Sequence, residues 1–176
     1  STTPSSKNPD FSKDIHVWLK SLQSLGLGSI THMNYSNRCI QAICDLADLL
    51  FPDFPHTESR NITVQTHMGI FLVAEKDIAA YYDEFHPKIL VHNITFGRRY
   101  PNFPCRNFGE VKGQTYDRVL IIPTKPILDF LKNGECSASS VNKLYVAITR
   151  ARLSVAFLAD CSCVHDCIKR WHPSQN

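Results

Sequence analysis

The sequence predicts an α/β domain in which a doubly wound, mainly parallel sheet carries helices on both faces. Residues 69–75 form a buried apolar run, residues 76–85 have a helical pattern, and residues 88–92 form a second apolar run. Residues 141–159 have the pattern of a helix that leads directly into an apolar strand. Strands that alternate with helices over short connections are typical of parallel sheets covered by helices.

The first 30 residues predict a lead-in and one short helix. Residues 1–9 are polar and contain two prolines, which is typical of a flexible segment. Residues 14–25 have an amphipathic helical pattern that glycines 26 and 28 end. We therefore expect residues 1–30 to follow a preceding domain and residues 31–176 to form the main domain.

The main domain begins with a predicted helix, for which Ser36 or Asn37 is a candidate N-terminal cap. The apolar stripe of this helix consists of Ile40, Ile43, Ala47 and Leu50. The prolines within residues 51–55 end the helix, and the polar residues up to 66 predict a loop. The first strand of the sheet follows.

Residues 93–108 predict an irregular, basic segment after the second strand. Three arginines, Arg98, Arg99 and Arg106, are interleaved there with four aromatic residues. This pattern suits phosphate contact and stacking on single-stranded bases. A loop held in place by its aromatic side chains explains the pattern at least as well. Between this segment and residue 141 the sequence predicts four elements: a Lys112-Gly113 turn, a strand at 119–122, a helix at 126–131 and a turn at 133–134.

The last predicted helix carries a candidate functional arginine. Its apolar positions, spaced as one buried face, are Val141, Leu144, Tyr145 and Ile148. At about 100° per residue, Arg150 lies in the last turn, roughly opposite that face and beside Lys143 and Ala147. Arg150 has two interpretations. The simpler one is a solvated cation that complements the helix dipole, and the alternative is a cation that serves a neighbouring site.

Two segments together resemble the last two motifs of superfamily 1 helicases of the UvrD/Rep kind. Residues 109–123 contain Lys112-Gly113-Gln-Thr-Tyr-Asp-Arg-Val, similar to the family's Lys-Gly-x-(Glu/Thr)-(Phe/Tyr)-Asp-x-Val element. Residues 144–151 read Leu-Tyr-Val-Ala-Ile-Thr-Arg-Ala, similar to its Leu-Tyr-Val-Ala-x-Thr-Arg-Ala element. The order and spacing agree with the family, and the resemblance extends from about Thr31 onward. It implies the second RecA-like domain of such a helicase, without the large inserted subdomain.

The resemblance also implies roles for individual residues. Arg150 corresponds to the arginine finger, which stabilises charge on the transferring phosphoryl group. Gly113 and Thr115 correspond to nucleotide-binding positions, although many relatives have Glu where Thr115 stands. Lys112 is expected at the nucleotide cleft or on the DNA backbone. Arg98, Arg99 and Arg106 are candidates for contact with single-stranded DNA from their interleaving with aromatic residues alone, and not from the resemblance.

A third segment resembles the family's Asn-Tyr-Arg element, whose Tyr stacks on adenine and whose Arg reaches the γ-phosphate. Asn34 and Tyr35 match and are expected to bind nucleotide, but Ser36 occupies the Arg position. Arg38 lies two residues on, outside the matching register. A buried aromatic that packs before a helix is the alternative interpretation of Tyr35.

The chain contains no Gly-x-x-x-x-Gly-Lys-Ser/Thr phosphate loop. We therefore expect ATP and Mg²⁺ to be bound mainly by a separate N-terminal RecA-like domain of the same polypeptide, and this chain alone to be inactive. The whole protein is then an ATP-dependent DNA helicase. The alternative is a degenerate RecA-like domain that serves as a non-catalytic module for binding nucleic acid or protein.

Composition adds little to these expectations. The formal net charge of +3 over 176 residues is too small to indicate nucleic-acid binding by itself. No apolar run approaches 18 residues and no leader precedes the domain, so we expect a cytoplasmic protein without membrane contact. The seven cysteines are an odd number, which is typical of reduced thiols rather than a disulfide framework.

One cluster near the C-terminus has the residue types of a zinc site, namely Cys161, Cys163, His165 and Cys167. In an extended strand its outer cysteines would lie roughly 20 Å apart, far beyond shared metal bonds of about 2.3 Å. In a helix the potential ligands would fall on nearly opposite faces. We therefore expect no metal here and a plain C-terminal helix instead.

Overall fold

The computed structural model describes residues 15–29, 31 and 33–174. The chain divides into two compact units, Ser1–Met33 and Asn34–Asn176. In the first unit, helix α1 (Ile15–Ser24) forms where the sequence predicts it. The predicted lead-in at residues 1–9 lies outside the described residues. Within the described residues, no helix combines the length and apolar character that crossing a membrane requires.

The second unit is built on a parallel sheet whose six described strands lie in the order β5-β4-β6-β7-β3-β8. All neighbouring strands pair in parallel. The strands are β3 (Gly69–Val73), β4 (Lys88–Val91), β5 (Arg106–Asn107), β6 (Tyr116–Ile121), β7 (Ala151–Leu158) and β8 (Ile168–Arg170). A separate parallel pair joins β1 (Tyr35–Ser36) to β2 (Glu58–Ser59).

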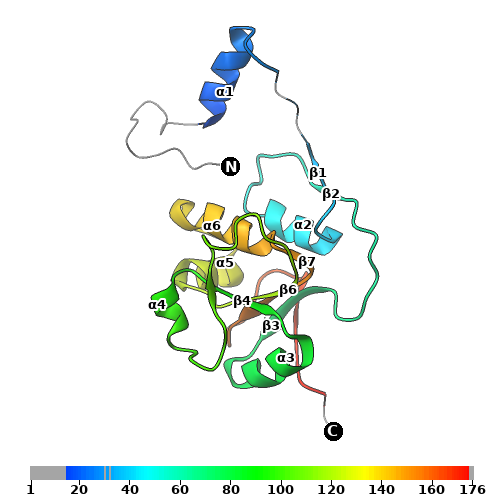
Figure 1. Cartoon of the computed structure of the whole chain (residues 1–176), viewed down its shortest axis with the longest axis vertical. Helices are drawn as coiled ribbons and strands as arrows, with labels where there is room; N and C mark the ends of the chain where they lie inside the picture. The colour runs from blue at the N-terminus through cyan, green and yellow to red at the C-terminus, as the bar shows by residue number, and fades with distance from the viewer. Residues whose placement is uncertain (1–14, 30, 32, 175–176) are drawn as a thin grey trace. The chain divides into compact units, whose positions relative to one another are not determined.

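Helices cover both faces of the sheet. On one face lie α2 (Gln41–Asp48), α5 (Lys125–Asn133) and α6 (Ala138–Ile148), and on the other lies α3 (Ile78–Phe85), after a 3-10 turn at Glu75–Asp77 (Figure 1). A short helix, α4 (Ile94–Gly97), follows β4. Strand residues alternate between the faces: Val119 and Ile121 pack with the first group, and Leu120 with α3. The predicted α/β class with a doubly wound sheet is confirmed, consistent with a RecA-like fold.

The start of α2 differs from the prediction. Ile40 is the N-cap residue, and no side chain caps the helix. Ser36 instead stabilises the preceding turn, where its Oγ accepts hydrogen bonds from the amides of Arg38 at 3.3 Å and Cys39 at 3.1 Å. The predicted cap at Ser36 or Asn37 is therefore wrong, because this hydroxyl is used locally by the turn.

The buried face of α6 is rotated from the predicted stripe. Tyr145 is 39% exposed, whereas Ala147 is fully buried together with Leu144 and Ile148. The helix packs on the sheet and also contacts α2 and α5. These neighbours, and not the spacing of apolar residues alone, determine which side chains of α6 are buried. The helix ends at Ile148, which places Arg150 in the connection to β7 rather than in the last helical turn.

The predicted C-terminal helix is wrong. Residues 159–167 are irregular, and the chain then adds β8 beside β3. Two contacts hold the irregular segment against the end of α5: Val164 N donates to Leu131 O at 3.0 Å, and His165 Nε2 donates to Phe130 O at 2.9 Å. These long-range contacts replace the local hydrogen bonds that a helix would have made.

Candidate functional site

Two sequence motifs meet at the edge of the sheet where the strands begin, here called the amino edge. Tyr116 of β6 is paired with Ala151 of β7 in the strand register, and Tyr116 N donates to Arg150 O at 2.9 Å. The loop at 112–115 and the connection at 149–150 are therefore neighbours. Sheet pairing, rather than sequence proximity, brings these motifs together.

Arg150 is half-buried and is anchored mainly through its inner nitrogen. Its Nε donates to Val146 O at 3.0 Å. Its terminal nitrogens make longer contacts, Nη2 to Thr149 Oγ1 at 3.3 Å and Nη1 to Gln114 O at 3.4 Å. Burial lowers the pKa of Arg150, and the nearby charge of Arg38 lowers that pKa further. The guanidinium nevertheless stays protonated, since its ordinary pKa lies far above neutral pH.

Arg38 is the functional candidate that the motif comparison missed. Its Nη1 donates to Thr149 O at 2.9 Å, so both arginines contact the same residue. The sequence comparison placed Ser36 at the phosphate-contacting position, but Ser36 holds the turn and the Arg38 side chain extends toward Arg150. One signal was available: Arg38 is the only lysine or arginine between residues 31 and 50.

No carboxylate in the described part of the chain pairs with either arginine. The ion pairs found there join Arg152 to Asp117 at 3.1 Å and His56 to the two aspartates of α2. Two adjacent positive charges repel each other, and an anion placed between them would relieve that repulsion. Guanidinium groups also match the oxygens of phosphate in geometry. The arginine pair thus has the chemistry of an anion site.

The 112–115 loop borders the arginine pair. Gly113 has a φ of +80°, a left-handed conformation that favours glycine, and a Cβ there would meet nothing within 4 Å. Lys112 and Thr115 are exposed, and Gln114 accepts from Arg150 through its backbone oxygen. The side chain of Gln114 is held by Tyr116 Oη and Glu110 O. Lys112, Gly113 and Thr115 are therefore all at the amino edge with Arg150.

Tyr35 and Asn34 lie beside the turn that carries Arg38. Tyr35 is half-buried in β1, and the guanidinium carbon of Arg60 lies 3.5 Å from its ring centroid. Asn34 is exposed, and its backbone oxygen accepts from Glu58 N at 2.8 Å. An adenine stacked on Tyr35 would therefore use the other ring face or displace Arg60.

A cavity of about 760 Å³ opens at the amino edge next to Thr115. Its walls are mainly basic and aromatic, with one carboxylate at Asp117, and they include Tyr82, Phe85, Lys88, Tyr116, Arg118 and Arg152. The ammonium of Lys88 lies 5.7 Å from the Tyr116 ring centroid, within reach of a cation–π attraction. The sequence analysis did not single out this surface, because its residues come from four separate segments.

Arg98, Arg99 and Arg106 lie elsewhere. Arg98 and Arg99 follow α4, beyond the end of β4, and Arg106 is in β5 at the edge of the sheet. Arg99 lines a crevice of about 580 Å³ at the edge where the strands end, here called the carboxyl edge. Because β7 spans eight residues, the two edges are separated by roughly 25 Å. The structure does not bring these arginines together with Arg150.

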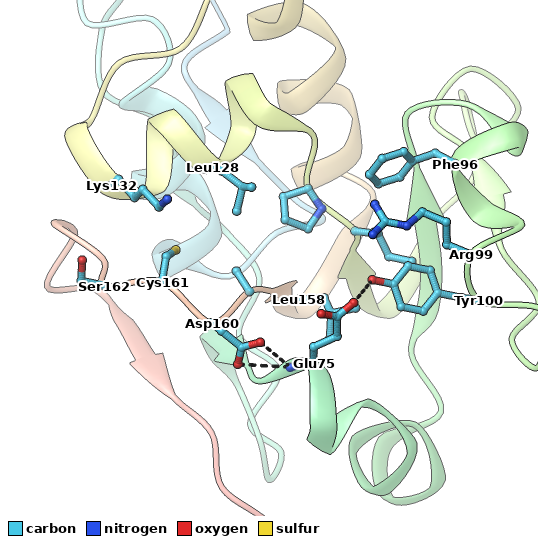
Figure 2. Close-up of a pocket in the computed structure, with 13 residues that line it drawn as sticks. Glu75, Phe96, Arg99, Tyr100, Leu128, Lys132, Leu158, Asp160, Cys161 and Ser162 are labelled. Carbon is cyan, nitrogen blue, oxygen red and sulfur yellow. Dashed lines mark hydrogen bonds between the residues drawn. The ribbon is translucent and has the colours of Figure 1, made fainter.

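The carboxyl-edge crevice has charges of both signs (Figure 2). Arg99 approaches the ring of Phe96 at 5.4 Å, and Lys132 of α5 contributes a second cation. Tyr100 Oη donates to a carboxylate oxygen of Glu75 at 2.7 Å. Burial and this carboxylate raise the pKa of Tyr100 to about 12. Asp160 accepts from Glu75 N at 3.4 Å.

Cys161, Cys163, His165 and Cys167 lie in the irregular segment that precedes β8. Among the residues that the structure describes, no group of three or more His, Cys, Asp or Glu side chains could hold a metal ion. His165 Nε2 donates a hydrogen bond to Phe130 O. Burial raises the pKa of the Cys163 and Cys167 thiols. Cys161 and Cys163 pack against the core cluster, whereas Cys167 is exposed.

Comparisons with known proteins add no family. No protein-family model matches this chain, and no curated protein matches it.

Proposed function

We propose that this chain is the second motor domain of an ATP-dependent DNA helicase or translocase of the UvrD/Rep kind. In this role it supplies an arginine finger to ATP held by a separate P-loop domain of the same polypeptide. The supporting observation is the convergence of Arg150 and Arg38 on Thr149, beside the Gly113 loop and without a carboxylate partner in the described residues.

The hydrogen bonds of Arg150 suit transition-state stabilisation. Its Nε bond to Val146 O fixes the base of the guanidinium, while Nη1 and Nη2 make only long contacts. Those two nitrogens can exchange weak contacts for two phosphoryl oxygens at small cost. Such a bidentate interaction strengthens as negative charge develops on the transferring group, so it accelerates hydrolysis rather than only binding ATP.

Arg38 supports the same step from a second direction. It is held by Thr149 O at 2.9 Å, so it adds a fixed positive charge beside Arg150. The repulsion between the two guanidiniums is relieved when a phosphate arrives, which makes the pair selective for a highly charged anion. ATP with Mg²⁺ is the substrate in this proposal, and the P-loop domain holds its remaining phosphates and the metal ion.

Two arms test the proposal. The 176-residue chain alone is expected to hydrolyse no ATP, and the polypeptide that includes the P-loop domain is expected to hydrolyse ATP faster when single-stranded DNA is added. Arg152→Ala serves as the matched control, because Arg152 is a nearby cation that already pairs with Asp117. DNA-stimulated turnover by the chain alone would contradict the proposal, as would turnover of the joined protein that survives removal of the Arg150 side chain unchanged.

A second candidate, a non-catalytic interaction module, is favoured by one observation. Arg60 covers a face of the Tyr35 ring that adenine could otherwise use. If the chain is such a module, the joined protein should bind nucleic acid or protein equally well with and without ATP. ATP-dependent changes in DNA affinity would exclude this candidate.

A further inference from the structure

The cavity beside Thr115, here called the amino-edge cavity, opens on the sheet face that α3 covers. Arg118 lines this cavity and precedes Val119, which packs in the core with residues of α2, α5 and α6. Because side chains alternate along a strand, Arg118 points to the α3 face. Arg150 is anchored to α6, on the other face of the sheet (Figure 1). The amino-edge cavity is therefore distinct from the arginine pair.

Two cations of the amino-edge cavity have no carboxylate partner. Of the described residues that line the cavity, Asp117 is the only carboxylate, and it pairs with Arg152 at 3.1 Å. In the described part of the chain, no carboxylate forms an ion pair with Lys88 or Arg118. Lys88 is half-buried, and its ammonium lies 5.7 Å from the centroid of the Tyr116 ring. Lys88 and Arg118 thus give the cavity two positive charges that no side chain balances.

Arg118 also has hydrogen-bonding capacity that the chain does not use. Its Nη2 donates to Thr66 O at 3.1 Å, which fixes the side chain. Its Nε is buried and has no hydrogen-bond partner among the described residues. A buried donor without an acceptor costs free energy, and an anionic oxygen that reaches this guanidinium would remove that cost. Arg118 is therefore arranged to receive an anion from the cavity.

Aromatic rings form much of the remaining wall, namely Tyr82 and Phe85 of α3 and Tyr116 of β6. His67 stacks on Phe85 with ring centroids 3.5 Å apart, so one face of the Phe85 ring is already covered. Tyr82 and Tyr116 are half-buried and are the rings on which a planar base can stack. The volume of about 760 Å³ suits a small ligand. The cavity therefore favours a planar ring that carries negative charge.

We propose that the amino-edge cavity binds a nucleotide unit that carries a terminal phosphomonoester. Its base stacks on the Tyr82 and Tyr116 rings, and its phosphate contacts Lys88 and Arg118. A phosphomonoester carries a charge of about −1.5 to −2 at neutral pH, whereas a phosphodiester within a strand carries a single negative charge. Two unbalanced cations match the terminal phosphate better. A free nucleoside monophosphate and the phosphorylated end of a single strand both supply this chemistry.

Binding to the 176-residue chain tests the proposal without ATP and without a P-loop domain. In titration calorimetry, thymidine monophosphate is expected to bind at least about tenfold more tightly than thymidine or inorganic phosphate, because base and phosphate are both contacted. Thymidine or inorganic phosphate that binds as tightly as the nucleotide would overturn the proposal. A phosphotyrosine peptide that binds more tightly than thymidine monophosphate would assign the cavity to protein recognition and would overturn it too.

Single strands distinguish the two sources of the ligand. Short oligothymidylates with a 5′-phosphate, a 3′-phosphate or two hydroxyl ends are compared by fluorescence anisotropy, with the fluorophore at an internal position. Tighter binding of one phosphorylated strand than of the hydroxyl-ended strand identifies a strand end as the ligand. If thymidine monophosphate binds but the three strands have equal affinity, the ligand is a free nucleotide.

Variants locate the bound phosphate. Lys88→Gln and Arg118→Gln should each weaken the binding of thymidine monophosphate about tenfold or more, because each removes a charge-assisted contact. Lys132→Gln is the matched control, since Lys132 lies in the carboxyl-edge crevice. Arg118 also holds Thr66 O, so Lys88→Gln alone decides if thermal unfolding shows that Arg118→Gln protein is not folded. Unchanged affinity in folded Lys88→Gln protein would overturn the proposal.

A further variant separates this site from the proposed ATP site. If Arg150→Ala abolishes the binding of thymidine monophosphate and Lys88→Gln does not, the phosphate lies at the arginine pair and the cavity assignment is refuted. The proposed function does not depend on this result, because it is decided by ATP turnover of the joined protein. The two proposals can therefore fail separately.

Discussion

Both edges of the sheet carry arginine side chains, but the groups that surround those arginines differ. At the amino edge, Arg38 and Arg150 contact backbone oxygens and a hydroxyl, with no carboxylate pairing among the described residues. At the carboxyl edge, Arg99 shares its crevice with Glu75 and Asp160. A site whose charges balance internally has little need of an external anion, whereas an unbalanced pair does. Whether an arginine binds an external anion is therefore better judged from the charges around it than from its presence alone.

The largest expected effect is at the amino edge. Arg150→Ala should lower ATP turnover of the joined protein by about 10³ to 10⁵, because an arginine finger acts mainly in the transition state. Its stability should change by about 1 kcal/mol or less, since the side chain fills no core. Arg99→Ala should leave turnover without DNA nearly unchanged. Steady-state kinetics and thermal unfolding check both values, and equal reductions for the two variants would remove the distinction between the edges.

A core substitution should affect both edges together. Leu144 is fully buried between α6 and the sheet, so Leu144→Ala should cost about 2 to 5 kcal/mol of unfolding free energy. Nucleotide and DNA activities should then decline in parallel with the folded fraction, measured by urea unfolding. A reduction of turnover alone in a well-folded Leu144→Ala protein would show that the α6 packing acts on the arginine pair directly.

Arg38 should have an intermediate effect. If Arg38 and Arg150 act as a pair, Arg38→Ala should lower turnover by about 10²-fold, the scale of removing one preorganised donor. Ser36→Ala tests the position that the family's arginine occupies, where this chain has Ser36. That change should act only through the turn and lower turnover by a smaller factor. The opposite ranking in kcat would show that Arg38 does not act with Arg150.

Single-stranded DNA distinguishes the edges more subtly. Removing one side chain that binds a DNA phosphate should reduce the slope of log affinity against log salt concentration by about one. Lys112→Ala at the amino edge and Arg99→Ala at the carboxyl edge should each weaken binding several-fold if both surfaces contact the strand. Fluorescence anisotropy across a salt series measures this. An effect of Lys112→Ala alone would confine the DNA path to the amino edge.

The smallest expected effect concerns a histidine close to the amino edge. His67 is stacked between Phe71 and Phe85, and burial, assisted by the charge of Arg118, lowers its pKa from 6.5 to about 4. Between these pH values the unfolded chain binds a proton that the folded chain does not, so stability falls as pH decreases through this window and is unaffected above it. His67→Phe should reduce this slope in pH-dependent thermal unfolding. An unchanged slope would show that His67 has the same pKa in the folded and the unfolded chain.

Much of the fold was predictable because burial patterns are local. A window of a few residues is enough to recognise the apolar runs of β3, β4 and β7 and the apolar stripes of α2 and α5. Strand β8 did not, because Ile168 is its single apolar residue and its stability comes from pairing with distant β3. The exposed face of α6 was misplaced for a related reason. Helix α6 contacts α2 and α5 as well as the sheet, and these additional neighbours help to determine which of its side chains are buried.

The sequence by itself determined most of the segments that become strands and helices of the sheet domain, and its motif resemblance predicted Arg150 and the Gly113 loop as parts of one site. Only the tertiary structure decided that Arg38, and not Ser36, extends toward Arg150, and that Arg99 lies at the opposite edge. The physical reason is that periodicity records burial along one element. The meeting of side chains from different elements depends on strand order and on the path of each turn, which local pattern does not encode.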